Sequence, residues 1–371
     1  MATFNDTYDL FPSVEYGRVF LTNLSLFLED LSMTLVVYEF YLCFLAVALT
    51  TFHLTILTRK SMRTSSIMSI MISIAICDLI SIIDAFGYPK IVLNFELQDC
   101  SAPLTLVEMH VFSVMQAIRD NAIRCSTWLS VTMALIRYLV LKLAVKGGTL
   151  KLSRFSFGFE AFGVAVLFST CLSVIFYLRV KIELAGEWGP ADFCPDAFPI
   201  GPYYETLPSD LFLAFDGLVL RVVMCTHGIV TKIIPCLLFP ILTGLLIYEL
   251  QKAQKKRRSS DKKSTERTTV LVIFMTVSFF IALLPSGLIT SLIVIYTDVG
   301  LLYMSTFADV ICGSLLTLNS CFHCFICFAM STQYRKTVKV VLRIPENIKP
   351  RAGSSNGGTT MHQNFMVTSS E

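Results

Sequence analysis

Seven long apolar stretches, separated by short polar connections, dominate the pattern along the chain. They run over residues 33–57, 67–88, 104–141, 155–178, 222–250, 268–296 and 301–328. A helix needs about 20 apolar residues to cross the hydrocarbon core of a bilayer, so each stretch is long enough to span a membrane. The pattern predicts an all-α membrane protein: a seven-transmembrane helix bundle whose two ends lie on opposite sides of the membrane.

Composition supports this interpretation and narrows the function. Apolar residues make up 54% of the 371 residues and charged residues only 15%, which is too apolar a balance for one soluble domain. The sequence contains no Walker loop, no H-E-x-x-H and no G-x-S-x-G motif, so we expect no enzyme. Polar residues inside the apolar stretches are costly in lipid, and they become the candidates for functional groups.

Basic residues concentrate in alternate connections between the stretches. They are Arg59, Lys60, Arg63, Lys142, Lys146, Lys151, Arg154, Lys255, Lys256, Arg257, Arg258, Lys262, Lys263, Arg335, Lys336 and Lys339. By the positive-inside rule these connections are cytoplasmic. The two N-x-S/T glycosylation sequons, at Asn5 and Asn23, precede the first stretch, which agrees with an extracellular amino end. The sequence thus predicts a multi-pass plasma-membrane protein with a cytoplasmic carboxyl end.

Four segments follow from this topology. We expect an extracellular segment over residues 1–32, the seven-helix domain over 33–328, an amphipathic eighth helix on the inner leaflet over 329–344 and a disordered cytoplasmic tail over 345–371. The eighth helix is predicted because residues 331–342 place aliphatic side chains on one side and basic ones on the other. The tail is rich in Gly, Ser, Thr and Asn and has little to bury, and its hydroxyl groups are candidate phosphorylation sites.

The connections on the predicted outer side are acidic. One of them, over residues 179–221, is long and contains several aromatic residues, which is typical of a lid over a binding site. An acidic mouth attracts a cationic ligand such as a basic peptide, although the positive-inside bias alone also depletes basic residues here. Cys100 and Cys194 are the two cysteines in outer connections, and we expect them to form a disulfide.

Several polar residues lie deep within the stretches. Asp78, Ser126 and Asn319 belong to the second, third and seventh, and in a bundle they can converge on a water-filled pocket able to hold a monovalent cation; a structural hydrogen-bond network is the alternative. Arg137 stands at the inner end of the third stretch, where its charge can reach a partner protein. Pro285 predicts a kink, and hence a hinge, in the sixth.

These residues, in this order, resemble the rhodopsin-like (class A) G-protein-coupled receptors over nearly the whole chain. Within that class the sequence is most similar to the nematode serpentine receptors of class W, chemoreceptors related to FMRFamide and myosuppressin receptors. The segments that carry the resemblance are Leu57 to Ser65, Cys77-Asp78-Leu79, Arg124 to Leu129, Ile136-Arg137-Tyr138, Pro285, Leu318-Asn319-Ser320 and Ser331 to Thr337.

The resemblance implies roles for individual residues. Asp78, Ser126 and Asn319 match a sodium site. Arg137, with Tyr138, matches the motif that contacts the G protein, and Asn319 to His323 matches the N-P-x-x-Y switch, with His323 in place of the tyrosine. Two departures concern basal activity. Ile136 replaces the acid that commonly restrains the neighbouring arginine, and Leu283 stands where many relatives have a tryptophan switch.

Position also suggests the ligand site. Arg119 lies about 27 Å before Arg137 along a helix, at the place where amine receptors have an aspartate, so an amine ligand is disfavoured. Asp120, Arg124, His227 and Asp309 are further candidates to line the cavity, with an acid taking the guanidinium of an Arg-Phe-amide peptide. In the alternative, these acids form internal salt bridges with Arg119 or Arg124.

Three functions remain open. The first is a receptor for an FMRFamide-like neuropeptide, the second a chemosensory receptor for small environmental molecules, and the third a transporter or channel, for which the internal repeats and paired broken helices are missing. The expected partners are an extracellular ligand, a heterotrimeric G protein, arrestin, receptor kinases and membrane lipid, with no nucleic acid. A bound sodium ion is the one cofactor considered.

Overall fold

The computed structural model describes residues 10–14, 16–82, 102–144, 151–190, 200–256, 262–296 and 298–343. Three of the expectations above fall outside these ranges: the sequon at Asn5, the Cys100–Cys194 disulfide and the tail over residues 345–371. They stay predictions from the sequence.

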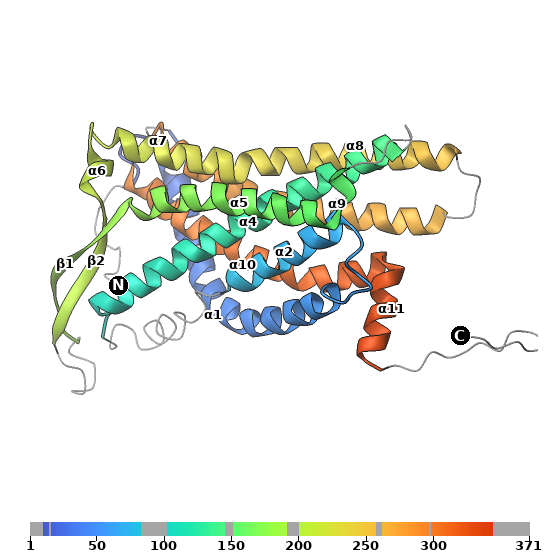
Figure 1. The fold of residues 1–371 in the computed structure, drawn as a ribbon. Helices are drawn as coiled ribbons and strands as arrows, with labels where there is room; N and C mark the ends of the chain where they lie inside the picture. Colours follow the sequence, from blue (N-terminus) through green and yellow to red (C-terminus); the bar gives the residue numbers. More distant parts are fainter. Residues whose placement is uncertain are drawn as a thin grey trace, which may run out of the picture.

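The chain forms a bundle of long helices with one small hairpin (Figure 1). The helices are α1 (Arg18–Leu57), α2 (Ser66–Ile80), α4 (Leu106–Ala144), α5 (Phe155–Tyr177), α6 (Asp210–Leu213), α7 (Leu218–His227), α8 (Ile234–Lys256), α9 (Lys262–Leu292), α10 (Val299–Met330) and α11 (Thr332–Val341). A 3-10 turn, η2 (Lys151–Ser153), precedes α5, and a π-helical segment, η3 (Gly228–Ile233), joins α7 to α8. The strands are β1 (Val180–Trp188) and β2 (Gly201–Pro208).

The long helices lie side by side, and the two ends of the bundle carry different elements. The β1–β2 hairpin lies at one end, and α11 lies across the other (Figure 1). We call these the hairpin end and the α11 end. Contacts run from α1 to α2, to α4, to α8, to α9, to α10 and back to α1, with α5 packed outside α2 and α4. The bundle is therefore a closed ring, and polar residues on its inner faces can meet.

Each of the seven apolar stretches overlaps helical structure in the described part of the chain. Among the described residues, five helices are long and apolar enough to cross a membrane, and the shorter apolar helices Ser66–Ile80 and Thr276–Leu292 supply the other two. Buried residues from several helices form the core, with Leu129 and Ile136 of α4 packed against Ile70 and Ile74 of α2. The predicted all-α membrane bundle is confirmed.

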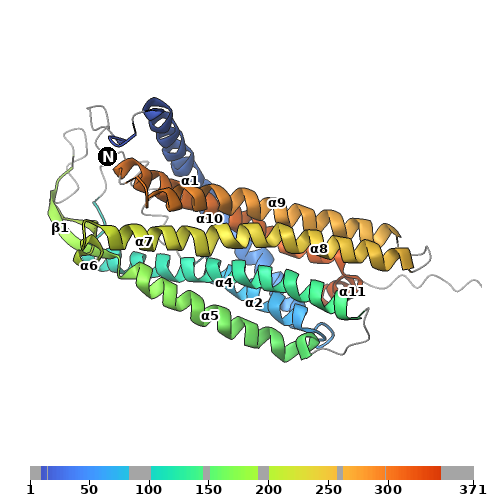
Figure 2. The ribbon, with the colours of Figure 1, turned by 90° about the horizontal axis from the view of Figure 1, so that it is seen from above.

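Two of the boundary differences bear on the expected segments. The first helix begins at Arg18 rather than at residue 33, because Leu21, Leu24 and Leu28 continue a helical apolar face that packs on the bundle. Figure 2 shows these first turns of α1 splaying away from the other helices. The basic connection expected over residues 251–267 is also shorter, since α8 continues to Lys256 and α9 begins at Lys262.

The fifth stretch is one continuous rod made of α7, η3 and α8. Its π-helical segment packs very closely on α9: a Cβ added at Gly228 would lie 2.9 Å from the carbonyl oxygen of Gly287 and 2.6 Å from Oγ of Ser291. Only glycine allows this approach of the two backbones. A π-helical turn often marks a functional position, and here it carries the buried residue Lys232.

The long connection after α5 contains an antiparallel hairpin that the sequence pattern did not predict. β1 pairs with β2 from Val180 opposite Pro208 to Trp188 opposite Gly201, with a bulge at Leu184 and Gly186. The helix α11 lies within the segment expected to form the eighth helix, and its Tyr334 and Val338 are buried against residues of α1 and α2. Its location on the inner leaflet stays a prediction.

Candidate functional site

A buried ion pair in the hairpin half of the bundle joins α1 to α4. Nη2 of Arg119 lies 2.9 Å from Oε1 of Glu39, whose side chain is only 2% exposed. Oε2 of Glu39 accepts a hydrogen bond of 2.7 Å from Oγ of Ser314 on α10. The charge of Arg119 is therefore neutralised inside the bundle by an acid of the first helix.

A second pair joins η3 to α10. Nζ of Lys232 and Oγ of Ser286 both donate to Oδ1 of Asp309, and Lys232 also donates a 2.7 Å hydrogen bond to Ser286. Ser286 directly follows Pro285, which lies inside α9. This polar cluster therefore links η3, α9 and α10 beside the proline that was predicted to act as a hinge.

Arg124 of α4 is bound by groups of α5 and α7. Its Nη1 donates to the carbonyl oxygen of Ser169 at 3.0 Å and to Oγ of Ser173 at 2.9 Å, and its Nη2 lies 3.3 Å from Nε2 of His227. Arginine has only donors, so Nε2 of His227 must accept and the ring proton must reside on Nδ1. The ring of His227 stacks on Phe176 with the centroids 4.4 Å apart.

Two polar groups of this region have no direct partner. Asp120 forms no hydrogen bond and no ion pair with any residue that the structure describes, although the charges of Arg119, Arg124, Lys232 and Asp309 all act on it. Nδ1 of His227 is buried and lacks a hydrogen-bond partner within the described ranges. A carboxylate acceptor and an imidazole donor of this region are therefore not satisfied by the groups that the structure describes.

The sequence offered salt bridges of Asp120 or Asp309 with Arg119 or Arg124 as an alternative, and the structure shows other pairs. Asp309 pairs with Lys232, and Arg119 pairs with Glu39, whereas Arg124 is bound by neutral groups. Sequence analysis did not single out Glu39 or Lys232. A signal was present, because each is an ionisable residue inside a stretch long enough to span the membrane.

The structure brings Asp78, Ser126 and Asn319 together. Oγ of Ser126 donates a 2.9 Å hydrogen bond to Oδ1 of Asp78, and all three residues line a cavity of about 20 Å³. Oδ1 of Asn319 is buried without a hydrogen-bond partner in the described part of the chain. A volume of this size is enough for one water or one small ion, so the oxygens present fit a monovalent cation.

His323 adds a nitrogen to this oxygen site. Its Nδ1 lies 3.2 Å from Oδ2 of Asp78, at ion-pair distance but not aligned for a hydrogen bond. The same residue also lines the larger cavity at the α11 end. His323 therefore stands between the Asp78 cavity and that larger cavity, at the position predicted to belong to the switch.

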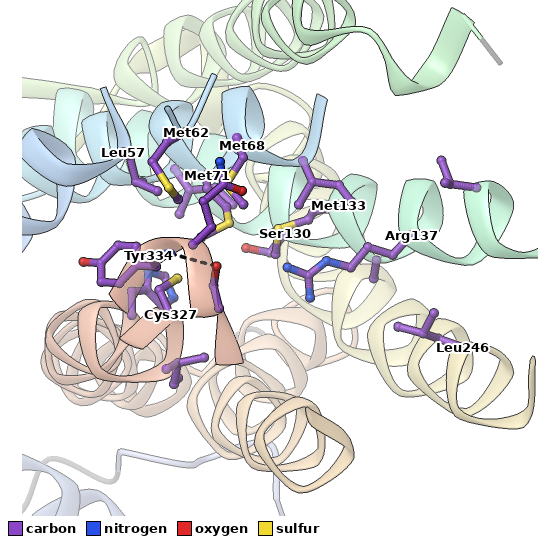
Figure 3. A pocket seen from close by; sticks show the side chains of 18 of the residues that line it. Leu57, Met62, Met68, Met71, Ser130, Met133, Arg137, Leu246, Cys327 and Tyr334 are labelled. Carbon is purple, nitrogen blue, oxygen red and sulfur yellow. Dashed lines mark hydrogen bonds between the residues drawn. The ribbon is translucent and has the colours of Figure 1, made fainter. Parts of the chain in front are cut away.

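The larger cavity has a volume of about 700 Å³ and is lined by residues of α1, α2, α4, α8, α9, α10 and α11. Figure 3 shows the guanidinium of Arg137 directed into this space, among methionine and leucine side chains. Arg137 makes no hydrogen bond or ion pair with the residues that the structure describes. Its neighbour Ile136 is buried in the core, and OH of Tyr138 accepts a 2.9 Å hydrogen bond from Lys142.

Comparison with known proteins assigns the family. The family described as serpentine type 7TM GPCR chemoreceptor Srw matches residues 37–345. The chain belongs to this family. It is also 27% identical, over 231 residues, to the G-protein coupled receptor dmsr-1 of Caenorhabditis elegans, a match that covers 61% of this chain and 44% of that relative. The chain thus matches less than half of the length of this curated relative.

Membership of the Srw family confirms the resemblance to class W receptors and agrees with the seven-helix fold. The protein is a multi-pass membrane receptor and not an enzyme. No group of three or more His, Cys, Asp or Glu residues suited to a metal ion occurs among the residues that were placed.

Proposed function

We propose that this receptor binds an amidated, FMRFamide-like neuropeptide at the hairpin end and activates a heterotrimeric G protein at the α11 end. The observation that carries the proposal is Arg137, a cationic side chain that faces a cavity of about 700 Å³ and contacts no acid in the described part of the chain. The resemblance to rhodopsin-like receptors assigns the matching arginine to the contact with the G protein.

The distribution of charge supports this orientation. At the α11 end, Arg59, Lys60 and Arg63 follow α1, and Lys336 and Lys339 lie exposed on α11. By the positive-inside rule such a basic end faces the cytoplasm. The hairpin end and the exposed sequon residue Asn23 would then face the exterior, where Asn23 can carry a glycan and the basic residues of α11 can contact anionic lipid.

The hairpin itself offers an acidic surface. Glu183 lies directly opposite Glu205 in the strand register, an arrangement that is destabilising unless a cation relieves it. Lys181 partly does so, with Nζ 2.8 Å from Asp210 and 2.9 Å from Glu183, and these bonds raise the pKa of Lys181. Glu187 and Glu205 are exposed and form no ion pair with described residues, so the surface would attract a cationic peptide.

Inside the bundle, the groups without partners match the terminus of an amidated peptide. The carboxylate of Asp120 would accept hydrogen bonds from a terminal amide or from an arginine guanidinium. Nδ1 of His227 would donate to a peptide carbonyl oxygen. Arg119, Lys232 and Asp309 would support the site through their internal pairs, and Arg124 would orient His227.

A receptor for small environmental molecules is the second candidate, because the matching family is described as chemoreceptors. In both cases the cavity beside Asp78 would hold a sodium ion that favours the inactive state, and Pro285 and His323 would take part in the switch. Receptor kinases and arrestin would act on the hydroxyl groups of the tail.

The proposal is tested in cells that express the receptor and report G-protein activation, challenged with amidated peptides and with the same peptides as free acids. We expect amidated Arg-Phe peptides to activate the receptor. Each free acid should be weaker by about a hundredfold or more, because placing its carboxylate beside the carboxylate of Asp120 costs roughly several kcal/mol. The variant Asp120→Asn should narrow this difference. Activation by metabolites or volatiles and by no peptide would establish the second candidate instead.

A further inference from the structure

The amino-terminal residues 10–14 insert an aromatic side chain into the hairpin end of the bundle. Phe11 is 0% exposed and packs against Met224 of α7, Ile293 after α9, and Leu301 and Met304 of α10. The fit is close, because a Cβ added at Gly300 would lie 2.6 Å from Cζ of Phe11. The pocket is therefore shaped for one flat aromatic ring.

Hydrogen bonds tie this segment to the start of α10, and Arg18 of α1 donates to the carbonyl oxygens of Pro12 and Val14. The carbonyl oxygen of Leu10 accepts a 3.0 Å hydrogen bond from the amide of Gly300, and the amide of Ser13 donates a 3.1 Å bond to Oδ1 of Asp298. Gly17 then turns the chain into α1 with a φ of 86°, a left-handed conformation that glycine adopts readily. Because residues 10–14 precede the helices, this segment can open locally without unfolding them.

The Phe11 pocket adjoins the proposed ligand site. Phe176 packs against the cluster around Phe11, and the same ring stacks on His227. Arg179 lies over the ring of Phe176, with Cζ 4.0 Å from its centroid. One aromatic wall is therefore shared between the pocket that Phe11 fills and the polar groups offered to a peptide terminus.

We propose that this pocket is a binding subsite for an aromatic side chain of the ligand, and that Phe11 occupies it as a built-in competitor. This rests on the proposed function as a peptide receptor. A ligand that brings its own aromatic ring must displace residues 10–14, so its apparent affinity is lowered by the fraction of receptors in which the segment is docked. Removing Phe11 makes the subsite available without a competing step.

The first arm of the test needs no natural ligand. Purified full-length receptor is heated with and without N-acetylphenylalaninamide, an aromatic probe that resembles the docked residue. We expect the probe to raise the melting temperature of Phe11→Ala, whose subsite is empty, and to leave the wild-type protein unchanged. Phe20→Ala, a change at an exposed phenylalanine of α1, is the matched control and should behave as the wild type. Equal stabilisation of all three proteins, or of none, overturns the proposal.

The second arm measures G-protein activation in cells with the peptide Phe-Met-Arg-Phe-amide as the probe. We expect Phe11→Ala to respond at about tenfold lower concentrations than the wild type, which corresponds to a segment docked roughly nine-tenths of the time. Asp298→Ala, which removes the acceptor for Ser13, should shift the response in the same direction, whereas Asp298→Asn keeps an oxygen there and should not.

The outcomes separate this inference from the proposed function. Unchanged or weaker responses of Phe11→Ala would show that the contact is only structural, and a fall of basal activity would show that Phe11 activates rather than competes. Either result overturns the inference while leaving a peptide receptor intact. If no variant responds to any peptide, the proposed function fails, and the heating experiment still decides whether the pocket binds an aromatic group.

Discussion

Buried arginine and lysine residues have bonded partners in the hairpin half of the bundle, but Arg137 in the α11 half has none among the described residues. In the hairpin half, Arg119 and Lys232 each contact a carboxylate, and Arg124 is bound by a carbonyl, a hydroxyl and an imidazole. In the α11 half, Arg137 contacts no acid within the described ranges and faces a cavity of about 700 Å³. The three arginines belong to the same helix, α4, so the halves differ in what surrounds each cation.

The difference separates charges that hold the structure from a charge that is available to a partner. A cation inside a membrane bundle is costly unless it is paired or lines a cavity that water or another protein can enter. The pairs of the hairpin half fix α1, α4, η3 and α10 relative to one another. Arg137 lacks the neighbouring acid that many relatives have, because Ile136 occupies that position and is buried, and its guanidinium therefore stays available.

The largest effect is expected when the available charge is removed. Arg137→Ala should abolish G-protein activation at unchanged surface expression, because removing a charged group from the proposed interface with the G protein costs about 2–5 kcal/mol. Arg137→Lys should retain part of the signal, since lysine keeps the charge but not the planar donor geometry. The measurement is G-protein activation at matched receptor density. Lys60→Ala removes an exposed cation at the same end of the bundle and should signal normally; full activity of Arg137→Ala would contradict the role given to this residue.

The next largest effect concerns the most buried pair. Glu39→Ala removes the carboxylate that Arg119 contacts and should lower the free energy of unfolding by about 3–5 kcal/mol. The double variant Glu39→Leu/Arg119→Leu should recover most of this loss, because an apolar pair replaces two buried charges. Thermal unfolding of the purified receptor is the measurement, and Glu160→Ala, at an exposed acid of α5, is the control. If Glu160→Ala lowered the free energy of unfolding by the same amount, the buried pair would contribute no more to stability than an exposed acid.

This pair also shows where reading the sequence reaches its limit. The lengths and polarity of the apolar stretches were sufficient to predict the seven helices, and motif positions were sufficient to place Asp78, Ser126 and Asn319 near one another, because their depth in each helix is similar. Which side chain faces which depends on the rotation and tilt of each helix, and neither is encoded in a hydropathy pattern. For that reason Asp120 and Asp309, which lie at a similar depth in the membrane, were considered as salt-bridge partners of Arg119, and Glu39 of α1 was missed.

The amino-terminal contacts were missed for a related reason. Phe11 is only a few residues from the end of the chain, in a segment that is polar overall. Its burial depends on a pocket made by α7, α9 and α10, which exists only after those helices have packed. A pattern of period 3.6 predicts a helix face, but nothing of comparable regularity marks a single aromatic residue that docks from a short segment.

A smaller effect is expected at the second ion pair, and the reason is exposure. The side chain of Asp309 is 43% exposed, compared with 2% for Glu39, so Lys232→Met should cost only about 1 kcal/mol in unfolding free energy after solvent screening. In a double-mutant cycle with Asp309→Asn, the coupling energy should be below that of the Glu39–Arg119 pair. Thermal unfolding of the four proteins gives the cycle. Equal coupling in both pairs would refute the ranking by burial.

The smallest effect is expected at Asp78, which lies between the two halves and has features of both. Its Oδ1 is bound by Ser126, as in the paired half, while its Oδ2 faces His323, which also lines the cavity of Arg137. If a sodium ion binds here, the nitrogen of His323 occupies space beside one of the oxygens that the ion needs. Replacing sodium by N-methylglucamine in the medium should therefore change the potency of an agonist only about twofold, or about 0.4 kcal/mol.

Removing the competing imidazole should sharpen that response. His323→Ala should increase the sodium effect to about fivefold, roughly 1 kcal/mol, because Oδ2 of Asp78 is then open to the ion. Asp78→Asn should abolish the effect in either background, since the charge that attracts sodium is gone. If His323→Ala left the sodium response unchanged while Asp78→Asn removed it, the ion would bind Asp78 without meeting His323. In that event His323 would contribute only to the cavity of Arg137 and not to the sodium site. Asp78 would then mark the limit between the hairpin half and the α11 half.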